Sequence, residues 1–136
     1  MVKTNSFVSS QAKKVRKAFF NATKDEKHIA MSCKLSKELQ ETHGIKRLPV
    51  RRDDEVHVFS GEFQNRDGKV VDVKLSEMRI YVDSASKQKK NGQDVKYPLH
   101  PSNCIITKLK MDKHRAELIK KKHENREKAL AKLGHK

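Results

Sequence analysis

Hydrophobic and polar residues alternate through the middle of the chain, most clearly in EVHVF (55–59), KVVDVKL (69–75) and MRIYV (78–82). A period of two residues is typical of strands that bury one face. The residues that the pattern places on the inner faces are Val56, Val58, Val71, Val73, Leu75, Met78, Ile80 and Val82.

Two further strands are expected downstream, a short one that begins at Leu99 and another at 104–109. Pro98 and Pro101 flank the first of them, which favours the edge of a sheet. We expect Asp83 to Asp94 to form a polar loop, with a turn at Asn91-Gly92. Five short strands at about ten-residue spacing indicate a small β-barrel.

The two ends of the chain have helical patterns. Ser9 or Ser10 is a suitable N-cap for a helix up to residue 20, and Ser36 begins another helix that Gly44 ends. A last helix is expected from Asp112 to Gly134. Its apolar stripe is thin, and we expect this helix and residues 1–20 to be mobile without a partner. The stripe consists mainly of Leu118, Ile119, Leu130 and Leu133.

Charge divides the chain in the same way. There are 32 Lys and Arg against 17 Asp and Glu, a net charge of +15. Residues 1–48 and 111–136 carry net charges of +7 and +5, and residues 49–110 only +3. The sequence therefore predicts a mainly β domain at 49–110, a basic N-terminal extension with short helices at 1–48 and a basic C-terminal helix at 111–136.

Such a charge imbalance predicts a polyanionic partner, either nucleic acid or an anionic membrane. A membrane-surface helix would need large apolar residues along one face, and the last helix has no aromatic residue. No run of about 18 apolar residues exists, and the N-terminus lacks the apolar region of a secretory signal. Nucleic acid is therefore the expected partner, although a chain that is merely basic remains the plain alternative.

Enzymatic and metal-binding motifs are absent from the sequence. It contains no GxxxxGK[ST], GxSxG, HExxH or GxGxxG. Asp53 and Asp54 are consecutive on a predicted strand, so their carboxylates would point to opposite faces. Cys33 and Cys104 are not in the close pairs that zinc sites use, and we expect free thiols without metal or cofactor.

Basic residues recur in both extensions and in the 84–92 loop, in the dispersed pattern that phosphate contacts require. Phe19 and Phe20, beside the first basic run, could stack on an unpaired base or fix the extension to the domain. The candidate RNA-binding residues are Lys13, Lys14, Arg16, Lys17, Arg51, Arg52, Lys87, Lys89, Lys90, His100, Lys108, Lys110, Lys113, Arg115, Lys120, Lys121 and Lys122.

The segment DDEVHVFSGEFQNRDGKVVDV (53–73) has the shape of a KOW motif, a strand and a Gly-containing loop followed by a second strand. Gly61 and Gly68 suit positions with positive φ, and Asn65 tolerates the same geometry. The flanking segments make the match specific. LSKEL (35–39), GIKRLPVRRDDEV (44–56) and LHPSNCIITKLKMDKHRAELIKKK (99–122) closely resemble the universal L twenty-four family of large-subunit ribosomal proteins, L twenty-six in eukaryotic naming.

The resemblance runs from about Ser10 to Lys122 and implies an SH3-like β-barrel with two extensions. It also implies a structural constituent of the large (60S-type) ribosomal subunit. Such a protein binds large-subunit ribosomal RNA near the peptide exit tunnel, joins early in assembly and supports translation. Its partners would be that RNA and neighbouring ribosomal proteins, with no small-molecule substrate, no membrane and no homo-oligomer. The expected location is the cytoplasmic ribosome, after nuclear or nucleolar assembly in a eukaryote.

The chain departs from the family in one loop, where Glu62 and Asp67 stand in place of the lysines of many relatives. We therefore expect loop 61–68 to face solvent or protein, and the acidic residues at 53–55 to form exposed pairs with Arg51, Arg52 or Lys69. The alternative function is a KOW-domain transcription or translation factor that uses this domain to bind proteins.

Overall fold

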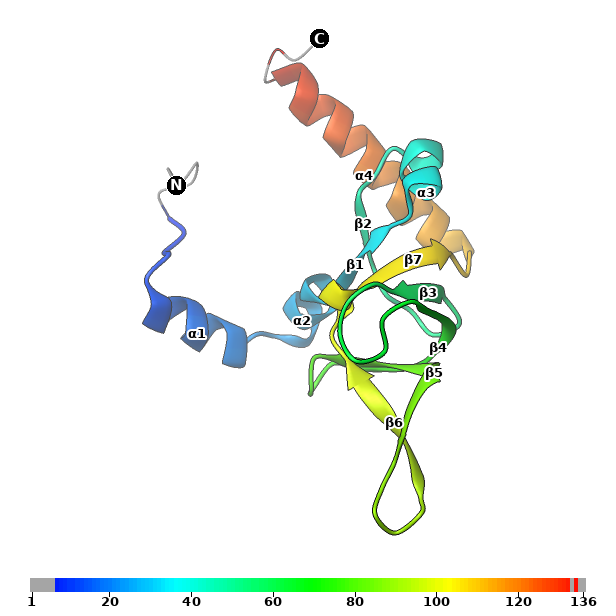
Figure 1. Ribbon diagram of the computed structural model, residues 1–136. Helices are drawn as coiled ribbons and strands as arrows, with labels where there is room; N and C mark the ends of the chain where they lie inside the picture. The colour runs from blue at the N-terminus through cyan, green and yellow to red at the C-terminus, as the bar shows by residue number, and fades with distance from the viewer. Residues whose placement is uncertain (1–6, 133, 135–136) are drawn as a thin grey trace.

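The computed structural model describes residues 7–132 and 134, and within them the chain forms one mixed sheet of seven strands. The strand order is β2-β1-β7-β3-β4-β5-β6. Neighbours are antiparallel except β1 and β7, which are parallel. The sheet curls but stays open, as expected of a mainly β, SH3-like fold (Figure 1). The strands are β1 (Ser32–Leu35), β2 (Arg47–Pro49), β3 (Glu55–Val58), β4 (Arg66–Lys74), β5 (Arg79–Gln88), β6 (Asp94–Leu99) and β7 (Cys104–Lys108).

Four α-helices and one 3-10 turn accompany the sheet in the described part of the chain. They are α1 (Ala12–Phe20), α2 (Lys24–Ala30), α3 (Lys37–His43), η1 (Pro101–Asn103) and α4 (Lys113–Lys132). Ser36 caps α3, and Gly44 ends it in the left-handed conformation with φ 65°, as predicted. The N-cap of α1 is Gln11 rather than Ser9 or Ser10, and residue 133 of the expected last helix lies outside the described residues.

Helix α2 was not expected from the hydrophobic pattern, although its sequence carries a start signal. The Thr23 hydroxyl accepts the backbone N–H of Glu26, and the Glu26 carboxylate accepts that of Thr23. This reciprocal capping box satisfies two backbone donors at the first turn.

Three expectations about strands were wrong. β1 and β2 were not anticipated, because three or four residues are too few to show a period. The expected loop from Asp83 to Asp94 is mostly a hairpin, with Ser86 paired to Lys96 and Gln88 to Asp94. Both of its faces are largely exposed, so its side chains do not alternate in hydrophobicity. Consequently Leu99 ends a strand and does not begin one, although β6 is an edge strand as predicted.

Strand residues make up most of the core, and Val56, Val58, Ile80 and Val82 are fully buried as predicted. In β4 the prediction was wrong at Val71, whereas Val73 and, just after the strand, Leu75 are partly buried against the core as predicted. Val70 is 1% exposed and Val71 is 40% exposed, because the register with β5 shifts between Val70 and Asp72. The other buried apolar residues include Met31, Cys33, Leu35, Ile45, Leu48, Val50, Phe63, Leu99, Cys104 and Ile106.

Of the three loop residues expected to have positive φ, two have it and Gly68 does not. Asn65 has φ 60° and Gly61 φ 102°, as predicted. Gly68 is an ordinary strand residue without positive φ. It is needed for close approach, since a Cβ there would clash with the side chains of Asp83 and Ser84.

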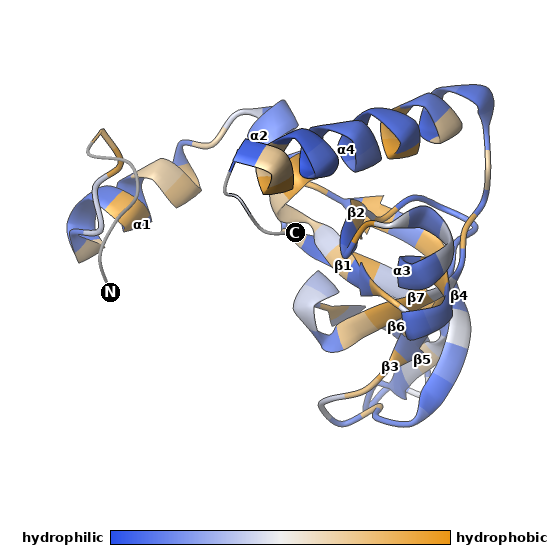
Figure 2. Cartoon of the chain, turned by 90° about the horizontal axis from the view of Figure 1, so that it is seen from above, coloured by the Kyte–Doolittle hydropathy of each residue, from blue (hydrophilic) through white to orange (hydrophobic). Residues whose placement is uncertain are grey.

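Helix α4 contacts the domain over its first half, which contradicts the expectation that it has no apolar face to bury. Ile119 is buried, and Leu118 is partly buried against the core. Further along, the Arg126 guanidinium donates to the carbonyl of Gly44 at the end of α3. Helix α1 differs, since none of its residues is buried and it stands away from the sheet (Figures 1 and 2).

Candidate nucleic-acid interface

The four basic residues of α1 are all exposed. Lys13, Lys14, Arg16 and Lys17 have no ion pair with any described residue, and no acidic residue lies in the helix itself. The Arg16 guanidinium carbon lies 4.9 Å from the centroid of the Phe20 ring. Helix α1 therefore presents uncompensated positive charge at some distance from the sheet.

Helix α4 presents a second group of cations. Lys113, Lys120 and Lys121 are exposed, Lys122 is half-buried, and none of them has an ion pair within the described residues. Figure 2 shows that α4 is hydrophilic along most of its length. The tip of the β5–β6 hairpin adds Lys89 and Lys90, which are also exposed.

The remaining lysines among the RNA-binding candidates, together with Arg51 and Arg52, form ion pairs with acidic residues. Asp53 binds both Lys110 and Lys69, at 2.5 and 3.1 Å, and hydrogen bonds from these two lysines hold the pKa of Asp53 below its usual value. The other pairs are Lys108 with Glu55 at 3.0 Å, Lys87 with Glu62 at 3.1 Å, Arg51 with Asp112 at 2.5 Å and Arg52 with Asp72 at 2.6 Å. These residues reach the surface, but with their charge partly neutralised.

The pairs differ from those expected for the acidic residues at 53–55. Lys69 is a partner of Asp53 as predicted, whereas the guanidinium groups of Arg51 and Arg52 bind aspartates elsewhere in the chain. The acidic residues of loop 61–68 also have partners within the chain. Its Glu62 binds Lys87, and its Asp67 lies 2.7 Å from Nδ1 of His57.

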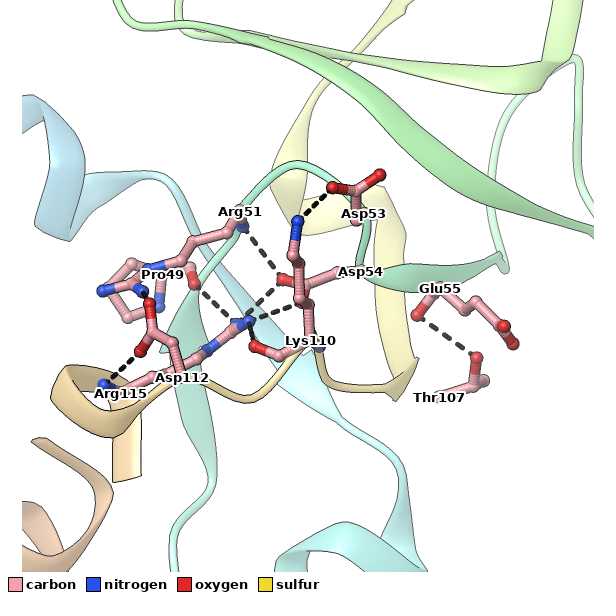
Figure 3. A network of polar contacts seen from close by, with 9 residues as sticks. All are labelled: Pro49, Arg51, Asp53, Asp54, Glu55, Thr107, Lys110, Asp112 and Arg115. Atoms are coloured by element: carbon pink, nitrogen blue, oxygen red, sulfur yellow. Dashed lines mark hydrogen bonds and ion pairs between the residues drawn. The ribbon is translucent and has the colours of Figure 1, made fainter. Parts of the chain in front are cut away.

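Arg115 does not belong to the surface at all. Its side chain is 2% exposed, and its guanidinium donates to both carboxylate oxygens of Asp54, at 2.5 and 2.8 Å (Figure 3). It also donates to the carbonyls of Pro49 and Lys110. The inclusion of Arg115 among the RNA-binding candidates is therefore corrected, because all of these donors serve the interior.

His100 is a half-buried ring rather than a surface cation. Its Nδ1 accepts the backbone N–H of Ser102 at 3.2 Å and lies 2.7 Å from the Ser102 hydroxyl. Burial, together with the charge of Arg79, lowers the pKa of His100 below its usual value, which favours the neutral ring. It can contribute a hydrogen bond to a partner but no charge.

Sequence reasoning missed Lys27 and Arg79 as candidates. Both lie beside Phe19, Phe20 and His100 around a cleft between the end of α1 and the turn that joins β4 and β5. They stand singly in the sequence, so no basic run marked them. Only the fold brings them to the two aromatic rings.

Within the described ranges, no group of three His, Cys, Asp or Glu side chains is placed to hold a metal ion. Cys33 and Cys104 are buried free thiols. Among the same residues, no helix combines the length and the apolar character needed to span a bilayer.

Comparison with known proteins agrees with this arrangement. Residues 9–122 match the family model that describes the eukaryotic ribosomal proteins L26 and their archaeal L24 counterparts. The chain is 45% identical over 122 residues to large ribosomal subunit protein uL24B of Saccharomyces cerevisiae, which covers 90% of this chain and 96% of the relative. It is 42% identical over 125 residues to uL24 of Caenorhabditis elegans, covering 92% and 88%.

A third relative, large ribosomal subunit protein uL24 of Dictyostelium discoideum, is 41% identical over 122 residues. The family model spans most of the chain, including the sheet, α1 and the first half of α4. Taken with the curled sheet and the exposed cations beside it, these matches show that the chain belongs to this family of ribosomal proteins, which are structural and not enzymatic.

Proposed function

We propose that this protein is a structural component of the large ribosomal subunit that binds large-subunit ribosomal RNA near the peptide exit tunnel. One structural observation carries the proposal. Several cations on and beside the sheet form ion pairs with acidic neighbours, whereas those of α1 and the exposed side of α4 have no ion-pair partner in the described chain. A polyanion supplies the missing charge, and each phosphate it brings releases bound counterions.

Recognition depends mainly on phosphate and on RNA shape. Helix α4 consists chiefly of Lys, Arg and Glu, and α1 combines Lys and Arg with apolar residues and contains neither Asn nor Gln. Amide side chains are among those that read base edges, whereas contacts from lysine to phosphate position the protein without reading sequence. The sheet then acts as a rigid base that sets the spacing between α4 and the β5–β6 hairpin.

The proposal has three further parts. The protein takes its place during early assembly of the subunit, in the nucleolus if the cell is eukaryotic, and then remains in cytoplasmic ribosomes. Neighbouring ribosomal proteins are its second class of partner. Loop 61–68, whose Glu62 and Asp67 are acidic, faces such a protein or solvent rather than phosphate.

Sedimentation of a tagged copy in a sucrose gradient tests the proposal. We expect the protein to sediment with large subunits and with translating ribosomes, and to stay on the large subunit after a high-salt wash. A KOW-domain factor that acts through protein contacts would instead be released by the wash. Recovery of the tagged protein only in the light fractions would contradict the ribosomal role.

A further inference from the structure

A cleft of about 470 Å³ lies between the N-terminal extension and the sheet. Phe19 and Phe20 at the end of α1 form one wall, and the turn between β4 and β5 forms the other, with Met78 and Arg79. Lys27 of α2 and His100 complete the lining, together with Ser76 and Glu77. Its volume falls within the range of pockets that hold small organic ligands.

The aromatic wall is not part of the core. Phe19 is 50% exposed and Phe20 is 61% exposed, and the two rings meet edge to face with 5.3 Å between centroids. The Arg16 guanidinium lies over the Phe20 ring. Two aromatic rings left this open, with a cation on one of them, offer the flat surface on which unpaired bases stack.

The rim of the cleft favours an anion. Lys27 and Arg79 have no ion pair within the described chain, and Lys13, Lys14 and Lys17 lie on the same helix as the aromatic wall. The single carboxylate, Glu77, is already engaged. It accepts the Tyr81 hydroxyl at 2.7 Å and pairs with Lys74 at 3.5 Å. The net charge around the opening is therefore positive.

Polar groups in the cleft suit a base as well as a phosphate. Because Nδ1 of His100 accepts the Ser102 N–H, the ring proton of the neutral imidazole lies on Nε2, which remains available as a donor. Met78 holds the opposite wall in place. Its backbone has φ 55°, a value that residues other than glycine rarely adopt, and its side chain is buried, so packing holds the turn in this conformation.

We propose that this cleft binds one unpaired nucleobase of the RNA, stacked on Phe20, with the neighbouring phosphates on Lys27 and Arg79. The proposal rests on the RNA-binding function proposed above and adds a base-dependent site to it. A base bound here touches α1 and the β4–β5 turn at once, so it fixes the direction of α1, which buries none of its own residues. The N-terminal helix then takes its final position only on RNA.

Two fluorescent probes of equal charge test the site with the full-length protein. One is a single-stranded RNA of 12 adenylates, and the other has the same number of phosphates with an abasic site at every position. Wild-type protein should bind the adenylate strand more tightly. Stacking of one base contributes about 1–3 kcal/mol, so Phe20→Ala should weaken binding of that strand by about fivefold or more and leave the abasic strand unchanged.

Phe59→Ala is the matched control, because Phe59 is an aromatic residue of similar exposure, 47%, that does not line the cleft. It should keep the preference for the adenylate strand, and Phe20→Trp should keep it as well. Lys27→Ala should weaken the binding of both strands alike and reduce the salt dependence of the affinity. A light-activated crosslink from 5-iodouridine in a 12-uridylate strand should fall on the tryptic peptide 18–24.

Three results would contradict the proposal that this cleft binds a nucleobase. They are equal binding of both strands by the wild-type protein, equal loss for both strands on Phe20→Ala, and crosslinks confined to other peptides. In each case, RNA binding itself would survive and the proposed function would stand. Failure of the wild-type protein to bind either strand, combined with its absence from ribosomal fractions, would overturn both proposals.

Discussion

The guanidinium of Arg115 and the carboxylate of Asp54 form a two-pronged ion pair inside the protein, with N–O distances of 2.5 and 2.8 Å. Asp54 is 0% exposed, and its oxygens also accept the backbone N–H groups of Arg51 and Lys110, each at 2.9 Å. The pair joins the segment before β3 to the first turn of α4. It is one of the main contacts that dock a basic helix on the sheet.

Arg115→Met should therefore destabilise the protein strongly. It leaves the Asp54 carboxylate buried without its cation, a change that costs about 3–5 kcal/mol in other proteins. Urea unfolding measures the loss. Lys113→Met is the matched control on the same helix turn, and because Lys113 is exposed its effect should stay within about 0.5 kcal/mol.

The same two variants distinguish a residue that stabilises the fold from one that contacts RNA. At a temperature where both are folded, Lys113→Met should weaken RNA binding, and Arg115→Met should not. A larger loss of affinity for folded Arg115→Met than for Lys113→Met would show that Arg115 contacts RNA after all.

Gly44→Ala should loosen α4 from α3. Gly44 has φ 65°, and an added Cβ would clash with the His123 ring of α4, so both strain and a steric conflict are introduced. We expect a loss of about 1–3 kcal/mol in unfolding free energy and faster amide exchange around residues 119–126. Gly92→Ala is the control, since Gly92 has φ 82° but open space around it. Equal exchange in α4 for the two variants would mean that the contact with His123 is unimportant.

Replacing Lys13, Lys14, Arg16 and Lys17 together by Ala should weaken binding to all RNA sequences alike. The slope of log affinity against log salt should fall by up to about four phosphate contacts, because counterion release is proportional to their number. Glu62→Lys should leave affinity nearly unchanged or raise it slightly. If the quadruple variant binds normally while a change in loop 61–68 abolishes binding, the hairpin is the RNA site instead.

The stability contributed by Asp112 should depend on pH. The backbone N–H of Arg115, and then the nearby charge of Arg51, hold the pKa of this carboxyl below its usual value. A group with a lowered folded pKa stabilises the protein above its unfolded pKa, about 3.9, and loses that contribution as pH falls through the folded value. Asp112→Asn should therefore be less stable than wild type at pH 7, with the difference vanishing towards pH 2. A difference that is constant over this range would exclude the charge as its source.

Both thiols should be inert in the folded protein. Burial raises the pKa of Cys33 far above its usual value and that of Cys104 to about 11, so almost no thiolate exists at pH 8. Iodoacetamide should label neither residue until urea is added, and both afterwards. Metal analysis that finds about one zinc per chain would contradict this account.

The sequence predicted best what depends on local spacing. Val56 and Val58 alternate with polar neighbours, and Ser36 and Gly44 mark the ends of α3, so neither needs knowledge of distant residues. β1, β2 and the β5–β6 hairpin were missed because their backbones pair without a visible hydrophobic period. The offset at Val70 arises from an irregular register, which only the pairing with β5 reveals.

The site was harder to predict than the fold, because the partner of each charge is chosen in three dimensions. A basic run shows that cations are present but not which of them are already neutralised. Arg115 and Lys113 look equivalent in the sequence, yet one is 2% exposed and the other lies on the surface. The cleft beside Phe20 could not be foreseen either, since it combines residues from α1, α2 and the β4–β5 turn.

Because β1 pairs in parallel with β7, β1 cannot take its place in the sheet until β7 has been synthesised. Lys34 and Leu35 leave the site of synthesis early, but their strand neighbours Ile105 and Ile106 come near the end of the domain. Until then β1 has only the three residues of β2 beside it, and a pair that short is barely stable in water. In a nascent or truncated chain that lacks β7, β1 and β2 are therefore not joined to the rest of the sheet, while the cations of α1 are already exposed to any RNA nearby.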